Sequence, residues 1–173
     1  MFETMTKQNK QVDIYLNNMK INKLRLANRT KYLIVNLENF KTIDELLDKI
    51  AYELENGTDI VQINEILNNA QKTIIIGKKL RELCSIYNVL LIMKSRIDIA
   101  QIIEADGIFL EKNDISIHNA KELVNETMIF GTKSDTENEI NDTITNNFDY
   151  VITKENTNIA SISHFYLDNI NIF

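Results

Sequence analysis

The chain has 173 residues, of which 44% are apolar and 25% charged, and its net charge is −6. The length predicts one domain with a sizeable core, and the negative charge argues against nucleic acid as a partner, because neutralising phosphates takes clustered Lys and Arg. No apolar run reaches the ~18 residues of a membrane span, no secretory signal is visible, and Cys84 is alone, so we expect a cytoplasmic protein without membrane or disulfide.

The first 30 residues are predicted to form an N-terminal extension. Residues 1–10 are polar, whereas residues 11–28 repeat apolar side chains at helical spacing, which indicates an amphipathic helix. The remainder, 31–173, is predicted to be a single β/α domain.

From residue 32 onward, short apolar runs alternate with helical stripes. Strands are expected at 32–35, 59–63, 88–93, 107–110, 128–130 and 150–152, and helices at 42–54, 69–86, 97–103, 117–124 and 137–145. Thr42 and Glu45 form a capping box at the first of these helices, and Gly57 follows its end. Continuous apolar strands that alternate with helices are typical of βα units around a parallel sheet.

Two architectures fit this alternation, an open doubly wound sheet and a barrel. An open sheet that binds dinucleotides usually has a Gly-rich turn after its first strand, and residues 36–39 contain no glycine. The tail, 154–173, is too apolar for a disordered segment. We expect it to pack back onto the domain, with a strand as one form that it could take.

Four segments resemble the thiamine-phosphate synthase/TenI family in their order and spacing. They are Tyr32-Leu33-Ile34, Gly57-Thr58-Asp59-Ile60-Val61-Gln62-Ile63, the stretch from Arg96 through Ala105-Asp106-Gly107 to Asp114, and Ile129-Phe130-Gly131 with Phe148-Asp149-Tyr150-Val151. The resemblance implies an α/β fold, a truncated or distorted TIM-type β/α barrel with about six parallel βα units and an N-terminal helix. Its site is expected at the C-terminal ends of the strands.

Members of this family join a pyrimidine pyrophosphate to a thiazole phosphate, or tautomerise the thiazole. The resemblance therefore links the chain to thiamine metabolism and implies a phosphorylated small molecule as ligand. Gln62 matches the family, but Asn64 and Ile66 stand where the family has the Arg and Lys that grip the pyrophosphate. Ser95 stands where the family has one Mg²⁺-binding Asp, and Asp114 matches the other, so Mg²⁺ is a candidate cofactor. These replacements imply a member that is catalytically impaired or inactive as a synthase, a pseudoenzyme.

The remaining candidate site residues are lysines that map to the mouth of the expected barrel. Lys94, Lys112 and Lys133 could bind phosphate together with helix N-termini, or they could be solvated surface side chains. Gln62 could orient a ligand or lie hydrogen-bonded beneath the pocket. Asp114 could be a metal ligand or the N-cap of the helix near residue 117, and we favour the cap.

The family's barrel would need about two more βα units than this sequence supplies. Six strands of an eight-stranded barrel would leave two exposed edges, and an open edge invites pairing with another chain. The N-terminal helix, the apolar tail or a second copy could cover them, and a homodimer is the simplest solution. The alternative function is therefore a non-catalytic binding or regulatory scaffold that self-associates through exposed barrel edges.

Overall fold

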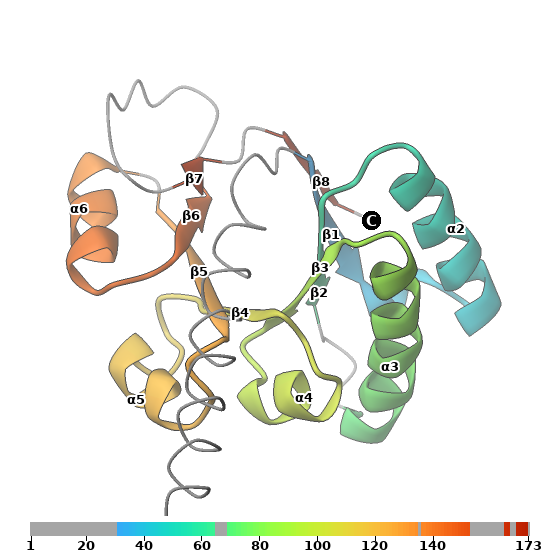
Figure 1. The fold of residues 1–173 in the computed structure, drawn as a ribbon, viewed down its shortest axis with the longest axis horizontal. Coiled ribbons are helices and arrows are strands. Elements are labelled where there is room, and N and C mark those ends of the chain that lie inside the picture. The colour runs from blue at the N-terminus through green and yellow to red at the C-terminus, as the bar shows by residue number, and fades with distance from the viewer. Residues whose placement is uncertain (1–30, 65–68, 135, 153–164, 167–168, 173) are drawn as a thin grey trace, which may run out of the picture.

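The computed structural model describes residues 31–64, 69–134, 136–152, 165–166 and 169–172 (Figure 1). The predicted helix at 11–28 lies outside these residues, so the division at residue 30 stays a prediction. The elements are β1 (Lys31–Asn36), η1 (Leu37–Asn39), α2 (Ile43–Glu55), β2 (Ile60–Asn64), α3 (Ala70–Ile86), β3 (Leu90–Lys94), α4 (Ile97–Ile102), β4 (Gly107–Phe109), α5 (Ile117–Glu122), β5 (Ile129–Lys133), α6 (Glu137–Thr145), β6 (Tyr150–Ile152), β7 (Phe165–Tyr166) and β8 (Asn169–Ile172). The six strands and five helices expected between residues 32 and 152 are confirmed, with small shifts at their ends. None of the helices in the described part of the chain is long and apolar enough to cross a bilayer.

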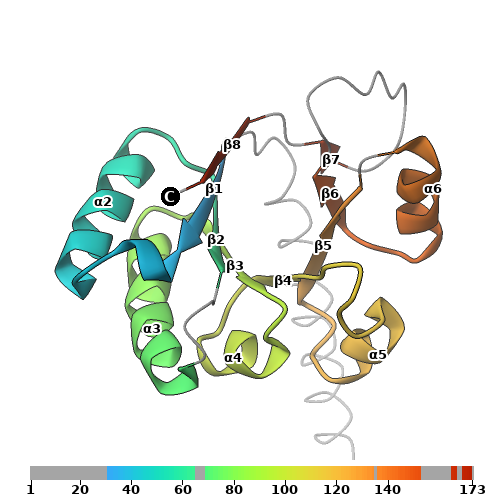
Figure 2. The same ribbon diagram turned by 180° about the vertical axis from the view of Figure 1, so that it is seen from behind.

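The strands form one parallel sheet in the order β7-β6-β5-β4-β3-β2-β1-β8. Figures 1 and 2 show this sheet curled like a horseshoe, with α2 to α6 on its outer side. Each of the strands β1 to β5 leads through a helix into the next strand, which lies beside it in the sheet. Six parallel strands, joined by five helices on the outer side, have the arrangement of a TIM-type β/α barrel, which confirms the predicted fold class.

Both faces of the strands are buried, which explains why the strand sequences are apolar without alternation. Successive side chains point to opposite faces of a strand, and the core divides accordingly. The inner cluster consists of Tyr32, Ile60, Leu90, Ile92, Phe109, Ile129, Tyr150 and Ile152. The outer cluster combines residues such as Leu33, Val61 and Leu91 with side chains of the surrounding helices, including Ile50 and Leu80.

An aspartate precedes each even-numbered strand of the barrel and ties it to the strand before. The carboxylates of Asp59, Asp106 and Asp149 accept hydrogen bonds of 3.1, 2.8 and 2.9 Å from the backbone N–H groups of Lys31, Leu91 and Phe130. The backbone N–H of each aspartate donates to the carbonyl of the same partner residue. These reciprocal pairs fix the register at the N-terminal ends of the strands, the end remote from the expected site.

The C-terminal tail covers both edges of the six-stranded sheet. β7 pairs in parallel with β6, and β8 pairs in parallel with β1. The prediction that the tail packs back is confirmed, and the strand is the form that it takes at 165–166 and 169–172. Of the three covers considered for the two edges, the structure shows the tail, which supplies a strand to each edge. The scaffold hypothesis loses the reason given for it, since those edges are already paired.

Candidate functional site

The C-terminal ends of the strands form the barrel mouth, and four polar side chains face inward there. Lys94 follows Ile92 of the inner cluster by two residues, and Lys133 follows Ile129 by four, so strand alternation places both on the inner face. Asn36 at the end of β1 and Asn64 at the end of β2 occupy equivalent, register-paired positions. The mouth is therefore lined by two amides on one side and two lysines on the other.

A chain of hydrogen bonds runs inside the barrel from β6 to the mouth. The Tyr32 hydroxyl donates to Gln62 Oε1 at 2.6 Å, so the Tyr150 hydroxyl, 2.9 Å from that of Tyr32, is the donor in their contact. Gln62 Nε2 donates to Asn64 Oδ1 at 2.7 Å, and Asn64 Nδ2 donates to Asn36 Oδ1 at 3.0 Å. Gln62 is 2% exposed and uses both ends of its amide. Of the two interpretations of Gln62, the structure shows the buried, hydrogen-bonded one.

Tyr32 and Tyr150, the two tyrosines of this hydrogen-bond chain, are neutral near pH 7. Burial raises the pKa of Tyr32 well above its ordinary value, and the neighbouring Tyr150 raises it further. Burial also raises the pKa of Tyr150, although its hydrogen bond with Tyr32 acts in the opposite direction. Phenols that remain protonated orient and donate hydrogen bonds, and they do not act as general bases at neutral pH.

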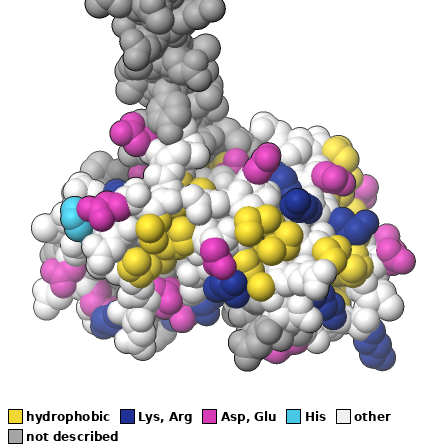
Figure 3. Space-filling view, turned by 90° about the horizontal axis from the view of Figure 1, so that it is seen from below, with side chains coloured by type: hydrophobic (Ala, Val, Ile, Leu, Met, Phe, Trp, Pro, Cys, Tyr) yellow, Lys and Arg dark blue, Asp and Glu magenta, His cyan; other side chains and the backbone are white. Residues whose placement is uncertain are grey.

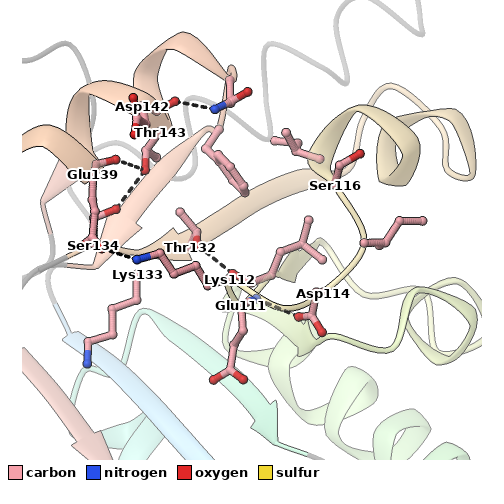
Figure 4. Close-up of a pocket in the computed structure, with 15 residues that line it drawn as sticks. Glu111, Lys112, Asp114, Ser116, Thr132, Lys133, Ser134, Glu139, Asp142 and Thr143 are labelled. Atoms are coloured by element: carbon pink, nitrogen blue, oxygen red, sulfur yellow. Dashed lines mark hydrogen bonds and ion pairs between the residues drawn. The ribbon is translucent and has the colours of Figure 1, made fainter.

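The lysines at the mouth differ in their surroundings. Lys94 Nζ lies 2.6 Å from Glu111 Oε1, and the two side chains are 26% and 55% exposed. Such a solvated pair contributes about 0–1 kcal/mol to stability, so another anion can replace Glu111 beside Lys94 at little cost. Lys133 is exposed, and Figure 4 shows its side chain pointing away from the hydroxyls of Ser134 and Thr143.

Asp114 fastens the loop between β4 and α5. Its Oδ2 accepts hydrogen bonds of 2.7 Å from the Ser95 hydroxyl and 2.7 Å from the backbone N–H of Glu111. The favoured interpretation of Asp114 as a helix cap is wrong, because Ser116 caps α5 by accepting from the N–H of Asn119 at 3.3 Å. Asp114 lies two residues too early for that role.

The donor set around Asp114 does not fit Mg²⁺. This ion takes hard oxygen ligands, usually one or two carboxylates, and Ser95 supplies a hydroxyl that already donates to Asp114. The same carboxylate oxygen accepts the Glu111 N–H. Within the described ranges, no group of three or more His, Cys, Asp or Glu side chains is arranged to hold a metal ion. The Ser95 hydroxyl and the Asp114 carboxylate are thus hydrogen-bonded to each other.

A hollow lies outside the strands, between the β4–α5 loop, the end of β5 and α6 (Figure 4). Its volume is about 280 Å³, and Lys112, Asp114 and Lys133 contribute to its lining. Lys112 forms an ion pair with Glu139 of α6. Gln62 and Lys94 do not line it. The predicted site residues thus divide into two groups, Gln62 and Lys94 inside the barrel and Lys112 with Asp114 outside it, and Lys133 lies at the boundary.

Sequence reasoning missed the tyrosines and asparagines of the internal hydrogen-bond chain. A signal for part of it was available, because Gln62 and Asn64 stand two residues apart on one strand and therefore share a face. Tyr32 and Tyr150 carry no comparable signal, since their contact joins residues 118 positions apart.

The curled parallel sheet and its outer helices define a β/α-barrel protein, a fold whose sites lie at the C-terminal ends of the strands. The sequence profile of the family described as thiamine monophosphate synthase matches residues 31–154. The chain therefore belongs to this family.

Individual relatives agree with this assignment. The thiamine-phosphate synthase of Haloarcula marismortui is 31% identical over 111 residues, 64% of this chain and 51% of that protein. The thiamine-phosphate synthase of Dictyoglomus turgidum is 28% identical over 132 residues, 76% of this chain and 59% of that protein. The structure of a thiamine phosphate pyrophosphorylase from Pyrococcus furiosus superposes with a TM-score of 0.67 and 26% identity, over 76% of this chain and 62% of that one. The chain spans about half the length of the curated relatives that it matches.

Proposed function

We propose that this protein binds a phosphorylated small molecule at the barrel mouth and does not catalyse the synthase reaction. The hydrogen bond between Ser95 and Asp114 is the observation that carries the second half of this proposal. A metal-dependent site would have a carboxylate at both positions. Here Ser95 supplies a hydroxyl, and that hydroxyl donates to the carboxylate of Asp114. Phosphoryl chemistry that relies on a divalent cation to neutralise developing charge therefore lacks its anchor here.

The amides at the other side of the mouth support the same conclusion. Asn64 stands where the resemblance places an arginine, and its Nδ2 donates to Asn36. A neutral amide cannot offer the charge-assisted, bidentate contact that arginine makes with a phosphate. The β1–β2 side of the mouth is thus built as an uncharged network that extends inward through Gln62.

The lysines support the binding of a phosphate group. Lys94 and Lys133 end the strands on either side of β4, on the inner face of the sheet. Glu111, the partner of Lys94, is 55% exposed, so an incoming phosphate can replace it without burying a charge. The relatives carry the name thiamine-phosphate synthase, which indicates a phosphorylated ligand for this site as well.

A paired assay tests this proposal. The protein, Mg²⁺, the pyrimidine pyrophosphate and the thiazole phosphate are combined, with the Dictyoglomus turgidum enzyme as positive control. We expect no product above the background without protein. Turnover at a rate near that of the control would contradict the proposed loss of synthase activity.

Binding is measured separately as the thermal shift caused by inorganic phosphate. We expect a concentration-dependent rise in Tm that is reduced in Lys94→Met and in Lys133→Met. Lys79→Met, which removes the same charge from an exposed position on α3, serves as the control and should keep the full shift. A shift that is absent from the unmodified protein, or equally reduced in the control, would remove the phosphate site.

Self-association, the absence of nucleic-acid binding and a cytoplasmic location belong to the same proposal. The net charge of −6 supports the second of these, and the single buried thiol of Cys84 is compatible with a reducing compartment. Light scattering, electrophoretic mobility shift and cell fractionation test the three statements in turn.

A further inference from the structure

The hollow between the β4–α5 loop, the end of β5 and α6 has a polar floor. Val35, Ile63 and Met93 occupy outward-facing positions near the ends of β1, β2 and β3, and all three belong to the outer core cluster. At the end of β5 the outward-facing positions are Thr132 and Ser134, and both line the hollow. Hydroxyl groups at buried positions give up hydrophobic stabilisation, so their placement here indicates a site as well as packing.

Three buried hydroxyl groups at this floor donate their hydrogens within the protein. The side chains of Thr132, Ser134 and Thr143 are 9%, 2% and 5% exposed. Thr132 donates to the carbonyl of Leu110 at 2.7 Å. Thr143 donates to the carbonyl of Glu139 at 2.8 Å. The Ser134 hydroxyl is therefore the donor in its 2.9 Å contact with Thr143.

The floor thus keeps the capacity to accept hydrogen bonds but has no hydrogen left to donate. A hydroxyl group has one hydrogen and two lone pairs. No donor among the described residues reaches the lone pairs of Thr132 or Ser134. Asp142 of α6 adds an exposed carboxylate to the lining (Figure 4). A molecule that complements this hollow must donate hydrogen bonds, and a positive charge on the donor strengthens them.

The two lysines at the rim do not supply those donors. Figure 4 shows the side chain of Lys133 pointing away from the hydroxyls of Ser134 and Thr143. Lys112 forms an ion pair with Glu139, and the Lys112 side chain is 83% exposed. A pair so open to solvent is weak, so an incoming cation can replace Lys112 beside Glu139 at little cost.

The walls of the hollow set the size and character of the rest of a ligand. Leu110 and Ile117 are 2% and 8% exposed, and the half-buried Phe148 packs against the same outer core cluster. The volume of the hollow is about 280 Å³. A cavity of about 150 Å³ is large enough for benzene. The space therefore suits an apolar body of about one ring that carries a single polar group.

The combination of apolar walls and buried acceptors favours a small molecule over a docked protein. Figure 3 shows the face of the molecule seen from below, where hydrophobic side chains form separate patches between charged groups. A partner that docks through apolar contacts needs a contiguous surface. A concave site with apolar walls and a few placed polar groups is typical of small-molecule binding.

We propose that this hollow is a binding site for a small primary amine, separate from the barrel mouth. The ammonium group, which is protonated at neutral pH, donates to the hydroxyl oxygens of Thr132 and Ser134 and is attracted by the carboxylate of Asp142. The apolar body lies against Leu110 and Phe148. The mouth is proposed to bind a phosphate, so the two sites take ligands of opposite charge.

Three probes that share one ring test this proposal: benzylamine, benzyl alcohol and benzoate. Each is titrated into the isotope-labelled full-length protein at constant ionic strength, and changes in the backbone amide resonances give the affinity and the location. We expect benzylamine to bind, with the largest changes at Thr132, Ser134 and Thr143. Benzyl alcohol should bind about tenfold more weakly, because hydrogen bonds from a charged donor are the stronger class. Benzoate should cause no change in the hollow.

Variants separate this site from general attraction to a negatively charged protein. Asp142→Asn removes an exposed carboxylate from the lining and should weaken benzylamine binding about threefold. Asp48→Asn removes the same charge from an exposed position on α2 and should leave the affinity unchanged. Ser134→Ala removes an acceptor from the floor and should weaken binding by more than Asp142→Asn does, with circular dichroism confirming its fold.

Several results would overturn the amine site. Benzoate or benzyl alcohol that binds as tightly as benzylamine would contradict the role of the charged donor. Equal effects of Asp142→Asn and Asp48→Asn would contradict the location, and so would benzylamine-induced changes confined to Asn36 and Asn64 at the barrel mouth. The absence of any benzylamine-induced change in the hollow would remove the site. These measurements do not depend on the phosphate assay, so each proposal succeeds or fails by its own result.

Discussion

A partly buried ion pair at the N-terminal end of the barrel gives the sharpest test of how burial affects the strength of a charge contact. Arg81 of α3 donates to Asp106 Oδ2 at 2.6 Å, and the same oxygen accepts the N–H of Leu91 at 2.8 Å. The side chains of Arg81 and Asp106 are 17% and 12% exposed. Arg81→Met keeps much of the aliphatic stem and leaves the carboxylate without its cation.

The expected magnitude follows from the burial of the remaining charge. Removing one partner of a fully buried pair costs about 3–5 kcal/mol. Water reaches a small part of Asp106, so we expect a loss of about 2–3 kcal/mol in the free energy of unfolding. For a chain of this size, that loss lowers Tm by roughly 5–10 °C.

Arg96→Met is the matched control, because Arg96 donates to Asp98 at 2.7 Å in a pair whose side chains are 36% and 62% exposed. The same substitution there should cost less than about 1 kcal/mol. Urea unfolding at 25 °C, followed by circular dichroism, measures both values. Asp106→Asn in the Arg81→Met background should restore part of the loss, since the amide oxygen can still accept from Leu91. Equal costs for the two arginine variants, or no gain from Asp106→Asn, would refute the reasoning.

The other predictions concern the barrel interior and individual titratable groups. Gly131→Ala should destabilise the fold by more than about 3 kcal/mol, because a Cβ would lie 1.9 Å from the Tyr150 ring; Tyr150→Leu should rescue it, and near-ultraviolet circular dichroism with urea unfolding measures both. Tyr32→Phe should cost about 1–3 kcal/mol in urea unfolding, because Gln62 Oε1 and Tyr150 lose their partner inside the barrel, and an unchanged midpoint would contradict the internal chain. Cys84 should resist a thiol reagent at pH 8 in the native protein and react fully in urea, since burial raises its pKa to about 12. The hydrogen bond from Arg96 lowers the pKa of Asp98, so the pair stabilises the fold above the unfolded pKa of about 3.9 and loses this contribution as the pH falls through the lower folded pKa; Asp98→Asn should therefore flatten the stability profile in that acid range.

The sequence predicted the positions of the candidate residues along their strands better than it predicted which side chains they contact. The alignment of short motifs with the family placed Gln62, Lys94 and Lys133 at strand ends. Lys94 and Lys133 are the last residues of their strands in the structure, whereas Gln62 is buried two residues before the end of β2. Position along a strand follows from local sequence, because βα units repeat in a regular way. Which partner a side chain meets depends on loops and on neighbouring elements, as with Lys94 and Glu111 or Ser95 and Asp114.

Asp114 illustrates the limit of local rules. An aspartate shortly before a helix is a frequent cap, and the sequence around residue 117 fits that pattern. Ser116 stands one residue before α5 and takes the role, whereas Asp114 is free to turn toward Ser95, which follows a different strand. The competition between these two side chains is settled by the path of the β4–α5 loop, which spacing alone does not reveal.

The sequence by itself determined the number and order of the βα units, the parallel sheet and the membership of the thiamine monophosphate synthase family, because apolar rhythm and strand-end motifs are local properties. Only the tertiary structure decided how the sheet ends. The contact between Tyr32 and Tyr150 and the pairing of residues 169–172 with β1 join segments far apart in the chain. Their formation depends on the accumulated curl of the whole sheet, which brings the first and last strands together, and no single segment of the sequence carries that information.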